Sequence, residues 1–257
     1  MAHLQVDFYS DALCMACRMH VLLPEAAPRG GVRTLYLLHG MSDDCSTWMR
    51  RTAIERYAGE KGLAVVMPDG GLGWYTDMRC GQKWFSFVAQ ELPRLCRRFF
   101  PMLSPRREDT YAGGLSMGGY GALKCCLRAP EVFSRAICLS GALDAAEIAR
   151  GGSVEAQPGY WQNVFGPAEA VPGSFDDLFA AAAELQSPAL RPEVYMWCGQ
   201  QDFLYDMNVR MRDHLRALGY ALCYGESPGD HQWKYWDCKI ADALNWLVPA
   251  EEVPTWL

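Results

Sequence analysis

Long hydrophobic runs are missing from the sequence: no stretch of its 257 residues approaches the roughly 18 apolar residues that a membrane-spanning helix needs. Residues 1–14 also lack the basic start and the apolar stretch of a secretory signal peptide. Positive charge is not in excess, since 24 Lys and Arg face 30 Asp and Glu, for a formal net charge of −6. Such a charge repels nucleic acids and anionic membranes. We therefore expect a cytoplasmic protein that binds neither of them, and the sequence leaves homo-oligomerisation open.

Metal-ligand spacing is lacking as well. Cys14 and Cys17 form a C-x-x-C pair, but no second pair and no set of histidines stands at ligand spacing from it. Asp43 and Asp44 lie in the stretch SDDCS, which offers too few oxygen ligands for a calcium loop. The eleven cysteines are an odd number, and in a reducing compartment we expect them to be small buried hydrophobic residues without a disulfide framework. We therefore expect no metal site.

What the sequence does contain is an alternation of β-rich runs and helical patterns, within a composition typical of globular proteins (50% hydrophobic, 12% aromatic). Such alternation favours an α/β fold, with a mostly parallel central sheet of about eight strands and helices on both faces. Strands are expected at residues 4–10, 17–24, 33–40, 63–71, 109–113, 133–141, 192–199 and 221–227. Helices are expected at residues 46–62, 87–101, 118–131, 206–219 and 231–247.

The chain is expected to form a single domain over residues 1–257. Between residues 144 and 192 the pattern loosens into Pro, Gly, Ala and aromatic residues, with a weak helical stretch at 175–185. We interpret 144–192 as a small, cap-like insertion over the edge of the sheet. Whether it moves as a lid is left open by the sequence.

One serine lies among five glycines in the stretch AGGLSMGGYGA, residues 112–122. Gly114, Ser116 and Gly118 fit the motif G-x-S-x-G, here between a predicted strand and a predicted helix, where this motif forms a sharp turn. The turn strains the serine backbone and brings strand and helix so close that side chains at 114 and 118 would collide. The helix N-terminus favours negative charge that develops at the hydroxyl. Ser116 is therefore predicted to be a nucleophile, the alternative being a glycine-rich turn with an incidental serine.

A serine nucleophile needs a base that removes its proton and a carboxylate that orients the base. His231 follows the last predicted strand, in a loop at the carboxyl edge of the sheet, and it is the preferred base. The other histidines are less suitably placed, in the N-terminal tail, within a strand, before a turn and within an amphipathic helix: His3, His20, His39 and His214.

Asp202 is the preferred carboxylate, because it follows the buried strand at 192–199 in a loop at the same carboxyl edge. Three other acids are left open as alternatives: Asp206, Glu226 and Asp230. Asp206 is expected to cap the next helix, and Asp230 is expected to point away from the imidazole. The resulting order of serine, acid and histidine along the chain is that of α/β-hydrolases, and it differs from the orders of the two well-known serine protease folds.

Backbone amides are expected to bind the oxyanion of a tetrahedral intermediate. In this architecture one donor is the amide after the nucleophile, that of Met117, and another comes from the loop after the third strand. In that loop, LLHGMSDD, Met41 is the first choice for the amide and Gly40 allows a close approach. The alternative for this stretch is an ordinary strand-ending turn.

With these residues in place, the chain resembles the esterase D family of α/β-hydrolases, which includes S-formylglutathione hydrolases, feruloyl and acetyl esterases, and mycolyltransferases. It is most similar to bacterial tributyrin-type esterases. The matching segments cover most of the chain: LYLLHGMSDD, VVMPDGGLGWYTDM, QELPRLCRRFFP, YAGGLSMGGYGALK, LSGALD, WCGQQDFLY and GDHQWKYWD. The resemblance implies the α/β-hydrolase fold, the triad and the oxyanion amides named above, and no metal or organic cofactor.

The resemblance also implies that the aromatic loop at residues 70–85 borders the substrate pocket. Trp74, Tyr75 and Trp84 of this loop are predicted to bind the substrate and to narrow the pocket to short acyl chains. The alternative for each ring is packing in the core, because large aromatic residues dominate cores as well as sites.

These observations predict a serine carboxylesterase that hydrolyses small acetyl-type or tributyrin-type esters through an acyl-enzyme intermediate. Residues 144–192 are the least similar to the family, so two other activities are left open. They are thioester hydrolysis of S-formylglutathione, and removal of feruloyl or acetyl groups from plant polysaccharide fragments. An alternative of another class is a non-catalytic binding module on the same fold, and the intact set of Ser116, Asp202 and His231 argues against it.

Overall fold

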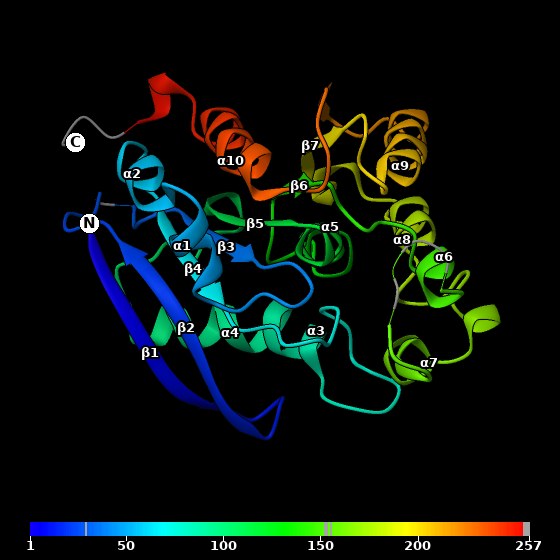
Figure 1. Cartoon of the computed structure of the whole chain (residues 1–257). Helices are drawn as coiled ribbons and strands as arrows, with labels where there is room; N and C mark the ends of the chain where they lie inside the picture. The colour runs from blue at the N-terminus through cyan, green and yellow to red at the C-terminus, as the bar shows by residue number, and fades with distance from the viewer. Residues whose placement is uncertain (29, 152–153, 155, 254–257) are drawn as a thin grey trace.

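The computed structural model describes residues 1–28, 30–151, 154 and 156–253. At its centre is one sheet of eight strands (Figure 1), in the order β1-β2-β4-β3-β5-β6-β7-β8. β1 and β2 form an antiparallel hairpin, β2 joins β4 antiparallel, and all other pairings in the sheet are parallel. The strands are β1 (Ala2–Ser10), β2 (Met15–Leu23), β3 (Thr34–Leu38), β4 (Ala64–Pro68), β5 (Thr110–Leu115), β6 (Arg135–Leu139), β7 (Glu193–Gly199) and β8 (Leu222–Ser227). The predicted mostly parallel sheet is confirmed.

The central strands are buried on both faces, which is why they read as continuous apolar runs in the sequence. In β3 all five residues are buried. Leu35 and Leu37 pack into one hydrophobic core, whereas Tyr36 and Leu38 pack into the other. Successive side chains of a strand point to opposite faces, so the sheet separates two cores.

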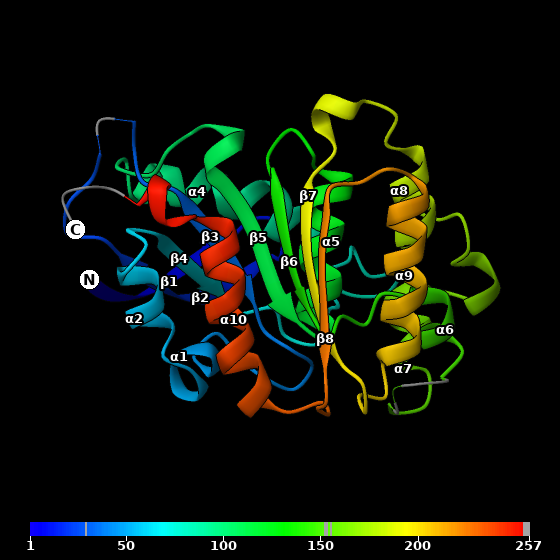
Figure 2. The ribbon, with the colours of Figure 1, turned by 90° about the horizontal axis from the view of Figure 1, so that it is seen from above.

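Helices cover both faces of the sheet, as predicted. α1, α2 and α10 share one core, and α4, α5, α8 and α9 share the other; Figure 2 shows the strands running between these two sets. Among the described residues, no helix is both long and apolar enough to cross a membrane. The helices are α1 (Thr47–Arg51), α2 (Ile54–Gly59), α3 (Trp84–Ser86), α4 (Leu92–Phe99), α5 (Met117–Arg128), α6 (Ala145–Ala149), α7 (Tyr160–Phe165), α8 (Leu178–Glu184), α9 (Tyr205–Ala217) and α10 (Trp233–Leu247).

The helix predicted at residues 46–62 is instead two short helices, α1 and α2. Thr52 ends α1 because its backbone is extended there. The amide of Ala53 then donates to the carboxylate of Asp237 in α10, at 3.0 Å, rather than to a carbonyl of its own helix. A residue far along the chain therefore supports the interruption.

The helix predicted at 87–101 also differs in its limits. It begins earlier, at Trp84, and passes through a π-helical turn over Phe87–Glu91 before α4. Pro93 lies in the first turn of α4. Because proline has no N–H to donate along the helix, a locally wider turn before it accommodates the residue without ending the helix.

Residues 144–192 connect β6 to β7 and contain α6, α7 and α8. Figure 1 shows these helices at one side of the molecule, beside α9. α8 contacts α5 and α9, and the buried residues Trp161, Val164 and Phe165 of α7 join the core on that side. The weak helical stretch predicted at 175–185 is α8. Residues 152, 153 and 155 lie outside the described residues, and a cap-like insertion on a single domain stays a prediction.

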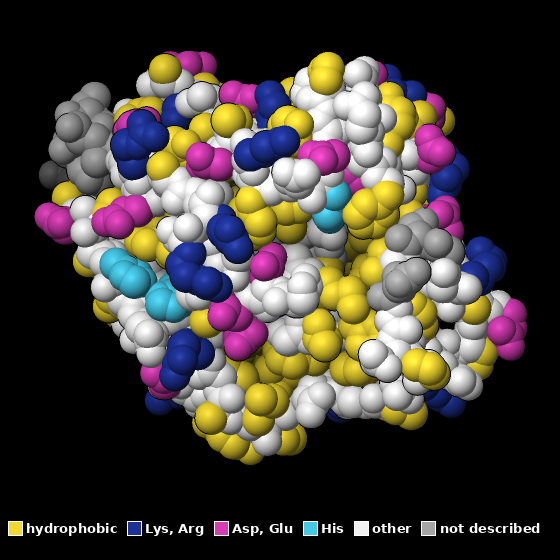
Figure 3. Space-filling model, viewed as in Figure 1, with side chains coloured by type: hydrophobic (Ala, Val, Ile, Leu, Met, Phe, Trp, Pro, Cys, Tyr) yellow, Lys and Arg dark blue, Asp and Glu magenta, His cyan; other side chains and the backbone are white. Residues whose placement is uncertain are grey.

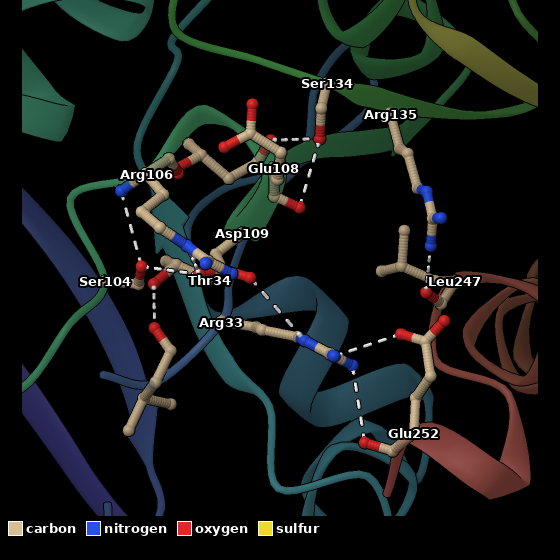
Figure 4. Close-up of polar contacts among 12 residues, drawn as sticks. Arg33, Thr34, Ser104, Arg106, Glu108, Asp109, Ser134, Arg135, Leu247 and Glu252 are labelled. Carbon is tan, nitrogen blue, oxygen red and sulfur yellow. Dashed lines mark hydrogen bonds and ion pairs between the residues drawn. The ribbon is translucent and has the colours of Figure 1, made fainter. Parts of the chain in front are cut away.

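The amino edge of the sheet is held by a polar network around Asp109 (Figure 4), which precedes β5. Its carboxylate is buried and accepts hydrogen bonds from the Ser104 hydroxyl at 2.6 Å and from Arg106 Nε at 2.9 Å. Arg33 Nε lies 3.7 Å away, and Nη2 of the same guanidinium group pairs with Glu252 at 3.0 Å. Burial by itself would raise the pKa of Asp109, but the hydrogen bonds from Arg106 and Ser104 and the charges of the two arginines outweigh burial and lower the pKa.

We expect Asp109→Asn to lower the free energy of unfolding at pH 7 by about 2 kcal/mol, because a charged hydrogen-bond acceptor is lost. A carboxylate whose pKa is lower in the folded state contributes stability above its unfolded pKa, which is 3.8 for this group, and the contribution is lost as the pH falls through the folded value. Urea unfolding from pH 7 to pH 3 should therefore show the two proteins converging below pH 3.8. Glu108→Gln, an exposed neighbour, is the control, and an equal loss there would contradict the assignment.

Candidate active site

Ser116 stands in a sharp turn between β5 and α5, at the carboxyl edge of the sheet. Its backbone has φ +53° and ψ −119°, a conformation that is disfavoured for a residue with a Cβ atom. Its amide donates to the Leu139 carbonyl at 2.9 Å. Its carbonyl accepts from the amides of Tyr120 and Ala142, both at 3.1 Å. The predicted strained turn is present, and hydrogen bonds on both sides of the serine hold it.

Glycine is needed on both sides of Ser116 because backbones approach closely there. A Cβ atom on Gly114 would lie 2.5 Å from the Gly118 carbonyl group. One on Gly118 would lie 2.3 Å from the Leu38 carbonyl oxygen at the end of β3. Both of these Cβ atoms would collide with backbone atoms, which cannot rotate away as a side chain would. The motif therefore sets the spacing of β3, β5 and α5 and brings the end of β3 beside the serine.

His231 and Asp202 reach Ser116 from two other loops at the same edge. His231 Nε2 lies 3.0 Å from Ser116 Oγ, and Nδ1 lies 3.0 and 2.8 Å from the two carboxylate oxygens of Asp202. Asp202 is 5% exposed, whereas the imidazole is half-buried. The amide of Leu204 donates to Asp202 Oδ1 at 2.9 Å and fixes the carboxylate. The structure thus brings the three predicted side chains together, with Nδ1 of the imidazole facing the Asp202 carboxylate and Nε2 facing the Ser116 hydroxyl.

The three competing acids do not contact the imidazole of His231. Asp206 is exposed in the first turn of α9, and the prediction that it caps this helix is wrong, because the N-terminal position is Leu204 and no side chain caps it. Glu226 accepts hydrogen bonds from side chains of the loop after β7 and of α9. Asp230 accepts from a side chain two residues further along. Of the four acids, Asp202 is therefore the one that contacts the imidazole.

Among the other histidines, His39 has a structural role beside the site. Its ring is buried, with Nδ1 2.8 Å from the Gly40 carbonyl, and its Nε2 accepts from the Gly70 amide at 2.8 Å. It therefore ties the loop after β3 to the loop after β4. The remaining histidines form hydrogen bonds on the β1–β2 hairpin and between α8 and α9: His3, His20 and His214.

The two amides predicted to bind an oxyanion are adjacent to the serine. Met117 is the first residue of α5, and neither its amide nor that of Met41 has a hydrogen-bond acceptor among the described residues. The loop after β3 lies close by, since a Cβ atom on Gly40 would be 3.7 Å from Ser116 Cβ. Amides left without an acceptor are uncommon in folded proteins. Two of them beside a hydroxyl can donate to an oxygen that enters the site.

The aromatic residues predicted to border the pocket are buried: Trp74, Tyr75 and Trp84 are 1%, 0% and 8% exposed. The Tyr75 hydroxyl donates to the His39 carbonyl at 2.9 Å. A Cβ atom on Gly121 would lie 2.4 Å from the Tyr75 ring. These rings therefore pack in the core, which was the stated alternative. Direct contact of the three with a substrate stays a prediction.

A cavity of about 430 Å³ lies beside the loop that follows β3. Its lining is mostly apolar: Met41, Leu72, Ala156, Gln157 and Tyr160. The Tyr160 hydroxyl donates to the Leu72 carbonyl at 2.6 Å and so joins α7 to the aromatic loop. On this face of the molecule, Figure 3 shows hydrophobic side chains gathered around a hollow. The volume is within the range of pockets that hold small organic ligands.

Tyr160, which lines the cavity, and Phe203, beside His231, were not among the predicted residues, whereas Leu72 lies in the loop that was predicted to border the pocket. The Phe203 ring is 55% exposed, and its centroid lies 4.6 Å from that of His231, so it covers one side of the imidazole. Its position directly after Asp202 was a signal that could have identified it. Tyr160 lies in the least patterned part of the chain, where the sequence offers no such signal.

Known proteins match this chain over nearly its whole length. The family model described as "Putative esterase" matches residues 10–247. The chain belongs to this esterase family. An acetyl esterase from Caldicellulosiruptor saccharolyticus is 33% identical over 262 residues, which cover 96% of the chain and 98% of that relative.

Two solved structures from Staphylococcus aureus are similar to this esterase. One is the fluorophosphonate-binding serine hydrolase F, with a TM-score of 0.89 at 31% identity, and the other is the S-formylglutathione hydrolase FrmB, with a TM-score of 0.86 at 31% identity. Each match covers 96% of this chain and 98% of the other. The fold is the α/β-hydrolase fold, and the resemblance to esterase D-type enzymes is confirmed.

Proposed function

We propose that this esterase is a serine carboxylesterase that hydrolyses short-chain acyl esters, with Ser116, His231 and Asp202 as its catalytic triad. The observation that carries the proposal is the continuous relay of contacts from Asp202 through His231 to Ser116 Oγ, at distances of 2.8 and 3.0 Å. The strained backbone of Ser116 supports the same proposal, because strain persists at sites where the surrounding structure holds it.

The reaction follows from this arrangement. Ser116 Oγ attacks the carbonyl carbon of the ester while its proton passes to His231 Nε2. The bond from that carbon to the alcohol oxygen then breaks, and His231 returns the proton to the departing alcohol. Water attacks the acyl-enzyme next and gives one proton to His231. The bond to Ser116 Oγ breaks, Oγ takes the proton back, and the carboxylic acid leaves.

The negative charge of each tetrahedral intermediate would be held by the amides of Met41 and Met117. Both are fixed before the reaction, Met117 at the start of α5 and Met41 by the loop that His39 ties down. Fixed donors stabilise a developing charge without having to reorganise. Gly40 gives the carbonyl oxygen room beside them.

The cavity beside Met41 is suited to bind a small, neutral acyl or alcohol group of the substrate. At about 430 Å³ it accommodates a modest ligand, and those lining residues that the structure describes carry no charged side chain. The similarity to an acetyl esterase points in the same direction. The substrate class we propose is therefore esters of short, uncharged acids, with no metal or organic cofactor taking part.

A second candidate is hydrolysis of the thioester S-formylglutathione. It is favoured by the 31% identity to an S-formylglutathione hydrolase over 96% of this chain. The same serine, histidine and oxyanion amides would act on a thioester, since only the leaving atom changes from oxygen to sulfur. The charged glutathione moiety would have to lie outside the apolar cavity.

Turnover of three substrates separates the candidates: p-nitrophenyl acetate, S-formylglutathione and methyl ferulate. We expect kcat/KM for p-nitrophenyl acetate to exceed that for each of the others by at least about tenfold, a difference of about 1.4 kcal/mol in transition-state binding. A preference for S-formylglutathione would establish the second candidate instead. A preference for methyl ferulate would indicate an enzyme for plant cell-wall fragments.

We further propose a cytosolic location. All eleven cysteines are free thiols, and four of them are exposed: Cys14, Cys80, Cys223 and Cys238. Exposed thiols persist in the reduced state in compartments that keep glutathione and thioredoxin reduced. Cell fractionation should recover the protein with cytosolic markers, and recovery with secreted material would contradict this location.

A further inference from the structure

A lysine is completely buried in the helix that follows Ser116. Lys124, in α5, is 0% exposed, and its ammonium group contacts the carboxylate of Asp176 in the segment before α8. It also donates to the Thr76 hydroxyl at 2.7 Å, and that hydroxyl donates in turn to Asp176. Three aromatic rings surround the ammonium, with centroids 5.3 to 5.4 Å away: Phe85, Tyr120 and Phe175.

Burying this ion pair costs free energy because both charges lose their contact with water. An apolar pair in the same place would stabilise the fold about as well. Desolvation lowers the pKa of Lys124, and the carboxylate of Asp176 opposes that shift. Replacing a buried pair by apolar residues of similar volume often leaves stability unchanged or raises it. A pair of this kind is best explained by what it holds in place. It joins α5, the aromatic loop and the segment before α8 at one point.

What the pair holds is a strained turn. Trp74 and Tyr75 have φ values of +53° and +48°, which are disfavoured for residues that carry a Cβ atom. Thr76, directly after them, is the residue that Lys124 and Asp176 bind. Strained backbone persists only where neighbouring contacts over-determine it.

The other end of the turn reaches the cavity beside Met41. The Leu72 carbonyl accepts a hydrogen bond from Tyr160 at 2.6 Å, and both side chains line the cavity of about 430 Å³. The ring of Trp74 also packs edge-to-face on Trp161, the residue after Tyr160. The cavity wall is therefore continuous with the turn that the buried ion pair holds.

We propose that Lys124 and Asp176 are positioning residues that hold the Trp74–Tyr75 turn and thereby set the length of acyl chain that the cavity accepts. The proposal rests on the proposed esterase function. Without the pair, the turn can relax toward a favoured conformation, and Leu72 and Tyr160 can move away from the cavity. Longer chains then enter more readily, whereas the chemistry at Ser116 stays the same.

The test compares p-nitrophenyl acetate, butyrate and octanoate as substrates of the wild type, of Lys124→Met and of the double variant Lys124→Met/Asp176→Asn. The double variant leaves no unpaired charge. We expect the ratio of kcat/KM for octanoate to that for acetate to rise about tenfold in both variants, the discrimination that one or two buried methylene groups provide. The change should lie in KM for octanoate, while kcat for acetate stays within about threefold of the wild type.

Three further variants make the outcome decisive. Asp176→Glu keeps the charge and should keep the wild-type ratio. Thr76→Val leaves the ion pair but releases the turn, so it should raise the ratio even if Lys124→Met fails to fold. Lys239→Met removes a partly exposed lysine that pairs with Asp242 in α10, on the other face of the sheet from Lys124, and should leave the ratio at its wild-type value.

The proposal is overturned if the variants lose thermal stability while their chain-length ratio stays that of the wild type, because the pair would then be structural only. It is also overturned if Thr76→Val keeps the wild-type ratio. Failure of the proposed function would be distinct from both results. In that case the wild type itself would hydrolyse none of the three esters.

Discussion

Ser116→Ala is expected to lower kcat for p-nitrophenyl acetate by roughly 10⁴- to 10⁶-fold, the range for loss of a catalytic serine. The variant has no oxygen 3.0 Å from His231 Nε2, so no acyl-enzyme can form. The backbone should not change, because alanine carries the same Cβ atom at the same positive φ. Stopped assays of acetate release, corrected for spontaneous hydrolysis, measure the loss.

A labelling experiment gives the same prediction an independent readout. A fluorophosphonate probe should attach to the peptide that contains Ser116 in the wild type and to no peptide of Ser116→Ala, as mass spectrometry can determine. Ser134→Ala is the matched control. This buried serine donates a hydrogen bond to the Thr110 carbonyl, at the opposite end of the strand that leads to Ser116, so it lies away from the proposed site. Hydrolysis that survives in Ser116→Ala at the wild-type rate would reject the mechanism.

The sheet and the candidate triad could be predicted from local patterns because each depends on short segments and one rule of topology. The run from 109 to 113 predicts a short strand, and glycine is required at 114 and 118 because a Cβ atom there would lie 2.5 and 2.3 Å from neighbouring backbone atoms. Residues that follow parallel strands meet at one edge of the sheet. Asp202 and His231 follow β7 and β8, so their approach to Ser116 could be expected without coordinates.

Contacts between segments that are distant along the chain could not be predicted from local sequence patterns. The break between α1 and α2 depends on Asp237, whose carboxylate binds the Ala53 amide 184 residues away. The same holds for Lys124, whose burial depends on Asp176 and Phe175, about 50 residues further along the chain. Periodicity reports which face of a helix is apolar, but it does not report what another segment places on that face.

The aromatic loop shows a different limit. Trp74, Tyr75 and Trp84 are consistent with either a pocket or a core in the sequence, because aromatic residues serve both. Which applies depends on small residues that the rings cover, such as Gly121 beneath Tyr75. The cavity wall instead includes Tyr160, from a segment without clear periodicity. A substrate pocket built from loops is therefore the part of such an enzyme that sequence patterns describe least.

Asp202→Asn is expected to lower kcat by roughly 10³- to 10⁴-fold while the fold stays intact. The amide of Leu204 donates to Oδ1 of Asp202, and an asparagine there would keep its oxygen on that amide. Its NH₂ group would then face His231 Nδ1 and donate to it. The imidazole would carry its proton on Nε2, the atom 3.0 Å from Ser116 Oγ, and could no longer accept the serine proton.

Asp206→Asn provides the matched control, because it makes the same change four residues further along, at an exposed carboxylate outside the relay. It should keep kcat within about twofold of the wild type, as surface substitutions usually have small effects. The pH profile of kcat distinguishes a lost base from a general loss of structure, since hydroxide can replace the base only at high pH. Activity of Asp202→Asn should therefore rise steadily with pH where the wild type has levelled off. Equal losses in the two variants would show that Asp202 acts through stability and not through the orientation of His231.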